Sequence, residues 1–138
     1  MSKYTDLVMA QRALMDPDGR PVYNCAQAVA TVFAQDAGYD ENAAMRAATY
    51  FRGGMQMGSV CGAITGGLIA LGLAGLSDAA TANEFIRKVK EGHGGLIHCK
   101  DLLAASAARG EVKKVHCDGM ICACIACVEE ALRENGKL

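Results

Sequence analysis

The sequence predicts an all-α protein, a compact antiparallel bundle of six to seven helices. Alanine is abundant, β-branched runs are short, and apolar residues recur at spacings of three and four, as on one face of a helix. Turns rich in glycine divide the chain into segments of bundle-helix length. The 138 residues are enough to bury one core. We therefore expect a single helical redox domain over residues 1–138, the redox character following from the cysteines described below.

Local start and stop signals place each helix. Asn24 and Gln27 have the spacing of a capping box, and Asp40 and Ser59 are expected N-caps. Thr81 and Glu84 form a further capping-box pattern. The expected helices cover residues 5–15, 25–37, 41–51, 60–76, the segment between 81 and 92, 99–108 and 121–134.

Composition excludes several classes of protein. Apolar residues make up 51% of the chain, charged residues 21%, and the net charge is -1. This balance is typical of a soluble globular protein, and it lacks the basic face that a nucleic-acid-binding protein needs. The uncharged run 60–76 contains five glycines and is interpreted as a buried core helix. The N-terminus does not resemble a signal peptide. We expect a cytoplasmic protein with no membrane insertion and no nucleic-acid partner.

Seven cysteines are the unusual feature of the composition. In a reducing compartment, many cysteines indicate metal or redox chemistry more often than structural disulfides. Cys25, Cys61 and Cys99 each fall in the first turn of an expected helix, and Cys124 falls near the start of the last one. Unpaired N–H groups and the helix dipole stabilise a thiolate there and are expected to lower its pKa. Four such thiols could bind a metal or cluster, form two reversible disulfides, or only pack in the core.

The C-terminal cysteines form a second pattern, with a CxxC at Cys124 and Cys127 that suits a redox pair or two metal ligands. The spacings do not match haem attachment, ferredoxins or zinc ribbons. Helical geometry directs Cys124 toward the core, places Cys127 at the edge of that face, and leaves Cys122 and Cys117 as extra cysteines.

Other residues are weaker candidates. Three glycines of the uncharged run indicate either a close helix–helix approach or space for a cofactor or another chain beside Cys61. Three methionines are expected to fill the core, and two histidines next to cysteines are candidate ligands or proton partners. These residues are Gly62, Gly66, Gly67, Met45, Met55, Met57, His98 and His116.

Three segments resemble the C_GCAxxG_C_C family of redox-active proteins: residues 24–29 (NCAQAV), 51–55 (FRGGM) and 60–66 (VCGAITG). Cys99 and Cys124 resemble its last two signature cysteines, and the likeness extends from about Val22 to Leu132. The resemblance implies a small helical protein, cytoplasmic in most members, with functional cysteines at Cys25, Cys61, Cys99 and Cys124. A related domain occurs in split-Soret cytochromes, where a cysteine-bound iron–sulfur centre is suspected. This chain has no haem-attachment motif, so cytochrome function does not carry over. It also has three further cysteines, so the fourth position could be Cys127 or Cys122.

We therefore expect the helix-start cysteines to converge on one site that binds an iron–sulfur cluster and exchanges electrons with an unidentified redox partner protein. The expected ligands are Cys25, Cys61, Cys99 and Cys124, before Cys127, Cys122 and Cys117. One alternative is a cluster-free thiol–disulfide protein using Cys25 with Cys61, or Cys124 with Cys127. Another is a structural zinc site in an adaptor protein. The glycine-lined helix is also compatible with a homodimer.

Overall fold

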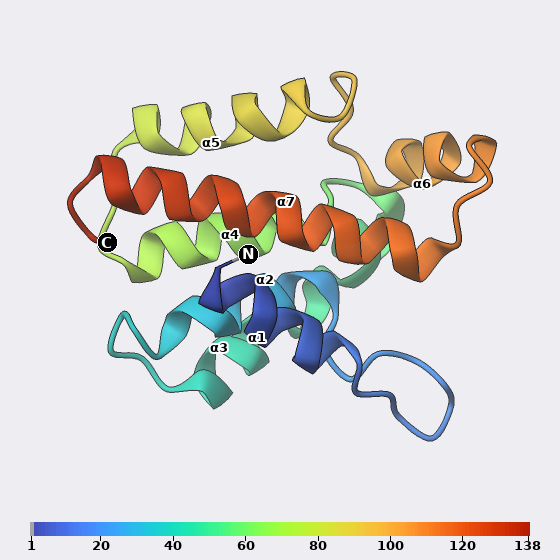
Figure 1. The fold of residues 1–138 in the computed structure, drawn as a ribbon, viewed down its shortest axis with the longest axis horizontal. Helices are drawn as coiled ribbons and strands as arrows, with labels where there is room; N and C mark the ends of the chain where they lie inside the picture. The colour runs from blue at the N-terminus through green and yellow to red at the C-terminus, as the bar shows by residue number, and fades with distance from the viewer. Residues whose placement is uncertain (1) are drawn as a thin grey trace.

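The computed structural model describes residues 2–138, and helices dominate that part of the chain (Figure 1). Apart from two isolated β-bridges, the described residues form no strands. The all-α prediction is therefore confirmed. The elements in chain order are α1 (Lys3–Arg12), α2 (Cys25–Ala34), α3 (Glu41–Ala47), the 3₁₀ turn η1 (Thr49–Phe51), the irregular turn η2 (Gly54–Gly58), α4 (Gly62–Leu73), α5 (Ala79–Glu91), α6 (Cys99–Ala108) and α7 (Lys113–Glu134).

The long helix α7 crosses the middle of the bundle, with α5 along one side and α1, α2 and α3 on the other (Figure 1). Helix α4 packs against both α2 and α7. Side chains from these helices meet in one core, which includes the fully buried Val29, Ile64, Phe85, Ile121 and Ile125. Burial of this apolar surface is the main force that holds the helices together.

Glycines in α4 allow its neighbours to approach closely. A Cβ atom added at Gly66 would lie 2.6 Å from the carbonyl oxygen of Ala26 in α2, and one added at Gly67 would lie 2.3 Å from Cζ of Phe85 in α5. No side chain fits at these distances, so glycine is needed at both positions. The structure thus uses these two glycines for helix–helix approach, the first of the two interpretations that the sequence left open.

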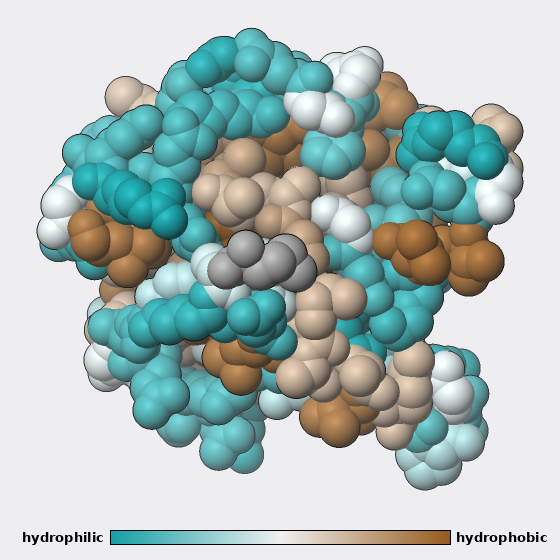
Figure 2. Space-filling model, in the orientation of Figure 1, coloured by the Kyte–Doolittle hydropathy of each residue, from teal (hydrophilic) through white to brown (hydrophobic). Residues whose placement is uncertain are grey.

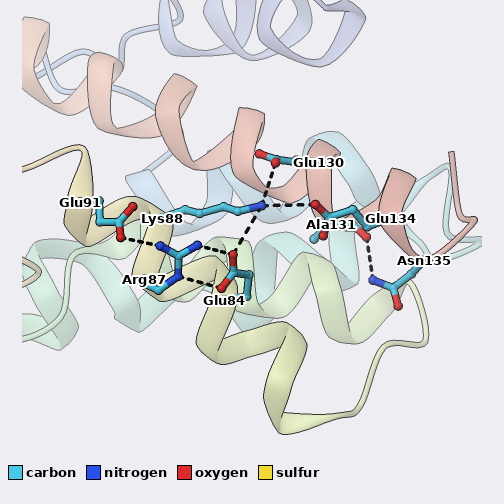
Figure 3. A network of polar contacts seen from close by, with 8 residues as sticks. All are labelled: Glu84, Arg87, Lys88, Glu91, Glu130, Ala131, Glu134 and Asn135. Atoms are coloured by element: carbon cyan, nitrogen blue, oxygen red, sulfur yellow. Dashed lines mark hydrogen bonds and ion pairs between the residues drawn. The ribbon is translucent and has the colours of Figure 1, made fainter.

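Charged side chains link α5 to α7 on the surface (Figure 3). Lys88 Nζ lies 2.8 Å from Glu130 Oε1 and 3.4 Å from Glu134 Oε1. On α5 itself Arg87 pairs with Glu84 and Glu91. Exposed pairs of this kind contribute little to stability. Helix α5 is held mainly by Phe85 and Val89, which are buried in the core.

Several predicted boundaries are wrong, and three helix starts are wrong because the cap differs from the expected one. Helix α7 begins at Lys113 rather than near residue 121, after an N-cap, Val112, whose side chain forms no capping bond. Helix α4 is capped by Cys61 and not by Ser59, and α5 by Asp78, whose carboxylate accepts from Thr81 N. Helices α1, α2, α3 and α4 all end earlier than expected.

The caps of α2 and α3 are confirmed at Asn24, with its capping box to Gln27, and at Asp40. One core prediction is wrong: Met57 is 74% exposed, because it lies in η2 at the surface.

No helix within residues 2–138 is both long and apolar enough to cross a membrane. The uncharged run instead forms α4, most of which is buried in the core as predicted. The face in Figure 2 is largely hydrophilic around its edges, with an apolar band across the middle. Exposed apolar residues of α1, the loop after it and the start of α7 include Leu7, Leu14, Val112 and Val115.

Candidate functional site

Four cysteines line one cavity of about 500 Å³. Residues of α6, of the first turns of α7 and of the N-terminal ends of α2 and α4 line it, and these parts of the helices lie toward the right of Figure 1. Three of its cysteines, Cys25, Cys61 and Cys99, are predicted site residues, and the fourth is Cys117. Cys124 does not line the cavity. The structure therefore brings together three of the four expected thiols and adds one that the sequence treated as an extra.

Cys25 is held at the cavity by the cap of α2. The Asn24 side chain accepts a hydrogen bond from Gln27 N at 2.8 Å, and the Gln27 side chain accepts one from Asn24 N at 2.9 Å. Asn24 Nδ2 also donates to the carbonyl oxygens of Ala48 and Thr49. These bonds fix the first turn of α2, and Cys25 is its first residue.

A short antiparallel bridge between Val60 and His98 positions the next two cysteines. The Cys61 amide donates to the Ile97 carbonyl at 2.9 Å, and the Cys99 amide donates to the Ser59 carbonyl at 2.6 Å. Helix α4 begins directly after Cys61, and α6 begins at Cys99. Two helix starts far apart in the sequence are thus joined side by side at the cavity.

The glycine-rich turn η2 packs against Cys99. A Cβ atom added at Gly54 would lie 2.8 Å from Cys99 Cβ and 2.5 Å from the Ser59 carbonyl oxygen, and Gly54 itself has φ of +67°. Met55 and Gln56 share this left-handed conformation, with φ of 58° and 67°. Such a conformation costs about 1–2 kcal/mol for each residue with a side chain. The turn beside the cavity is therefore held in a conformation of higher energy.

Cys117 and Cys25 line the same cavity, and each shifts the pKa of the other. Hydrogen bonding from Cys25 lowers the pKa of Cys117 to about 7, although burial opposes this shift. The positive charges of Arg12 and Lys113 lower it further. The same hydrogen bond, together with burial, raises the pKa of Cys25 well above its ordinary value. Cys117 is thus the more acidic thiol of the two, and Cys25 is the one that keeps its proton.

Arg12 connects this pair to the rest of the fold, and the sequence analysis missed it. Its side chain is 4% exposed; Nε donates to Asp118 Oδ1 at 2.7 Å and Nη1 donates to the Tyr23 carbonyl at 2.7 Å. These bonds join α1, the residue before the α2 cap, and α7. A lone arginine near the end of a helix carries no sequence signal for this role, which depends on tertiary packing.

The expectation that helix starts lower cysteine pKa values is wrong for Cys25, as described above, and for Cys61 and Cys99. Burial raises the pKa of Cys61 to about 11, although hydrogen bonds from the backbone N–H groups of Ala63 and Ile64 lower it. Burial also raises the pKa of Cys99. Desolvation therefore outweighs the helix terminus at these positions. The lowered pKa belongs to Cys117, in the second turn of α7.

A family model described as "Putative redox-active protein (C_GCAxxG_C_C)" matches residues 23–131. The chain belongs to this family. Comparisons with curated proteins and with solved structures found no match. The family description contains the motif GCAxxG, whereas residues 61–66 of this chain have the sequence CGAITG. A Cβ atom at Gly62 would lie 3.2 Å from Cys25 Cβ, so the family motif packs directly against Cys25.

The other cysteines of this C_GCAxxG_C_C protein lie outside the cavity. Because α7 begins earlier than expected, Cys124 lies in the middle of this helix and not near its start. Its side chain is fully buried, and burial raises its pKa. Its predicted orientation toward the core is confirmed. Cys122 and Cys127 are half-buried, and the Cys122 thiol lies 3.7 Å from the Met9 sulfur. His116 is buried and lines the cavity, whereas His98 is exposed and does not.

Thiolates are the ligands of iron–sulfur clusters, so the donors present at the cavity are of the right kind for one. Cys25, Cys61, Cys99 and Cys117 are the residues that could hold it. Within residues 2–138, however, no three His, Cys, Asp or Glu side chains are grouped so as to hold a single metal ion.

Proposed function

We propose that this protein is a thiol–disulfide redox protein in which Cys25 and Cys117 cycle between a dithiol and a disulfide. The observation that carries the proposal is the presence of both thiols at the wall of one cavity, where Cys25 lowers the pKa of Cys117. This pair differs from the pairs considered in the sequence analysis, which were Cys25 with Cys61 and Cys124 with Cys127. The family match to redox-active proteins supports the same class of chemistry.

The reaction begins at the Cys117 sulfur, because the thiolate is the nucleophile in disulfide exchange. Cys117 attacks one sulfur of a substrate disulfide, RSSR, whose S–S bond breaks and releases one thiolate, RS⁻. The Cys25 thiol gives its proton to that thiolate and then attacks Cys117 in the mixed disulfide. The second RS⁻ leaves as the Cys25–Cys117 disulfide forms. Two electrons pass from the protein to the substrate, and a dithiol reductant returns them in the reverse sequence.

Peptide mapping of oxidised protein tests the proposal. Reduced, metal-free protein is treated with a small-molecule disulfide, alkylated and digested, and the linked peptides are identified by mass. A Cys25–Cys117 link is expected, and it should be absent from Cys25→Ser and Cys117→Ser. Cys122→Ser and Cys127→Ser are matched controls, because these half-buried cysteines lie outside the cavity. Formation of no disulfide, or of one between other cysteines only, would contradict the proposal.

A second candidate function is electron transfer through an iron–sulfur cluster. Four cysteines from four separate segments line one cavity, and this observation favours it. When bound, such a cluster would supply one-electron transfer. Iron, zinc and acid-labile sulfide are measured in protein purified without oxygen. Whole-number iron and sulfide contents that fall in each of the Cys→Ser variants at 25, 61, 99 and 117 would favour the cluster over the dithiol. Zinc in their place would favour the structural zinc site considered from the sequence.

A further inference from the structure

The cysteine cavity is surrounded by basic side chains. Arg20, Arg52, Lys100 and Lys113 line it in addition to Arg12, and no aspartate or glutamate of the described residues does so. The chain as a whole carries a net charge of -1. The positive charge at the cavity is therefore a local concentration and does not reflect the composition.

Four of these cations are available to a ligand. Arg12 is buried and committed to Asp118 and to the Tyr23 carbonyl, but the other four side chains are exposed. None of those four forms an ion pair within residues 2–138. By contrast, the neighbouring Lys114 is paired with Asp118 at 2.7 Å.

The four cations come from four different segments, which makes their convergence a property of the fold. Arg20 lies in the loop after α1, Arg52 before η2, Lys100 in the first turn of α6, and Lys113 at the start of α7. The Lys100 side chain lies along Gly58, where an added Cβ would meet its Cβ at 3.2 Å. Lys113 lies four residues before Cys117 in α7, so the two side chains share one face of that helix.

The size of the cavity defines the ligand further. A volume of about 500 Å³ lies within the range of pockets that bind small molecules. Pro21, Leu102, Leu103 and Met120 form apolar parts of its wall. The site therefore combines a cationic rim, an apolar wall and nucleophilic sulfur.

We infer that the substrate of the Cys25–Cys117 pair is a small-molecule disulfide that carries negative charge. Its carboxylate-like groups bind the cations of Arg20, Arg52, Lys100 and Lys113, and its sulfur atoms lie over Cys117. This inference rests on the proposed dithiol function, and the exchange reaction is the one given above, with R an anionic group. A positive field at the mouth of a cavity raises the local concentration of anions and hence the rate of encounter.

Three disulfides of similar length that differ in charge test the inference. Reduced, metal-free protein is reacted with 3,3′-dithiodipropionate (dianionic), 2-hydroxyethyl disulfide (neutral) and cystamine (dicationic). Each rate constant is divided by that for free 2-mercaptoethanol with the same disulfide, which removes their intrinsic difference in reactivity. We expect the normalised rate to be about tenfold higher for the dianion than for the neutral compound and lowest for cystamine, with the order collapsing at high salt.

Variants then assign the preference to the cavity. The double variant Arg52→Gln/Lys100→Gln should lose most of the preference for the dianion over the neutral disulfide. Lys90→Gln is the matched control, because Lys90 is an exposed lysine of α5 that does not line the cavity. Equal normalised rates for all three disulfides, or an equal effect of Lys90→Gln, would overturn the inference. A Cys25–Cys117 disulfide that still formed in those experiments would leave the proposed dithiol function standing, whereas its absence would remove both.

Discussion

Cys25 and Cys117 line the same cavity and shift each other's pKa, although one begins α2 and the other lies in the second turn of α7. The two pKa shifts have opposite signs: the pKa of Cys25 is raised and that of Cys117 is lowered, so Cys117 is the stronger acid. The pair is thus divided into a nucleophile and a proton-bearing partner before any substrate binds. This division is what a two-step disulfide exchange needs.

Removal of the Cys25 thiol should raise the pKa of Cys117. In metal-free Cys25→Ala the hydrogen bond is lost, so the pKa should move from about 7 toward the ordinary value of about 8.5. Above its pKa Cys117 is a thiolate, so the variant should react on the order of tenfold more slowly near pH 7 and at an unchanged rate near pH 10. The rate of iodoacetamide alkylation of Cys117, followed by peptide mass as a function of pH, measures this shift. Cys127→Ala serves as the control, and a Cys117 profile that was the same in Cys25→Ala as in the wild type would show that no such hydrogen bond acts.

The two glycines Gly66 and Gly72 should respond oppositely to alanine. At Gly66 the new methyl group would lie 2.6 Å from the Ala26 carbonyl, so α2 and α4 must separate, at a cost of about 1–3 kcal/mol. At Gly72, in the same helix, nothing lies within 4 Å, and alanine should stabilise the fold by about 0.5–1 kcal/mol. Urea unfolding of both variants measures the difference. A Gly66→Ala protein as stable as Gly72→Ala would mean that the close approach of α2 and α4 is not as described.

The cap of α2 should matter more than the cap of α3. Asn24→Ala removes one capping bond and the two bonds from Nδ2 to the segment after α3, and should lower the free energy of unfolding by about 1–2 kcal/mol. Asp40→Ala removes a single exposed bond to Asn42 N and should cost about 0.5 kcal/mol. Chemical denaturation measures both losses. If the two variants were equally stable, the buried bonds of Asn24 would not be what anchors Cys25.

Local chemistry explains which parts of the fold could be predicted from the sequence. The caps at Asn24 and Asp40 depend on residues within three positions of one another, so they are visible in the sequence and correctly placed Cys25. The start of α7 was missed because Val112 offers no capping side chain. That error moved Cys124 to a helix start and left Cys117 outside the expected site.

The burial of the site could not be predicted in the same way. The helix-start argument considers a thiol near unpaired N–H groups in water, whereas Cys61 is 6% exposed and loses more from desolvation than it gains from those groups. Lys113 and Cys117, four residues apart, share a helix face, and this is a usable signal once the true start of α7 is known. The placement of Cys117 and Cys25 at one cavity, and the role of Arg12, depend on tertiary packing alone.

Alanine substitutions at Cys124 and Cys117 distinguish two candidate sites: the one that the sequence predicts, which includes Cys124, and the one at the cavity, which includes Cys117. Cys124 is fully buried, so Cys124→Ala leaves a small void and should cost about 1 kcal/mol of stability. Because Cys124 does not line the cavity, this variant should keep the Cys25–Cys117 disulfide and any iron that the wild type binds. Cys117→Ala, at the half-buried position, should instead lose the disulfide. Stability by denaturation, disulfide mapping and iron content are measured on both. Loss of redox chemistry in Cys124→Ala, with Cys117→Ala unaffected, would assign the fourth site position to Cys124. The reason is that, when the fold remains intact, the site loses its function only if the substituted thiol reacts or binds there.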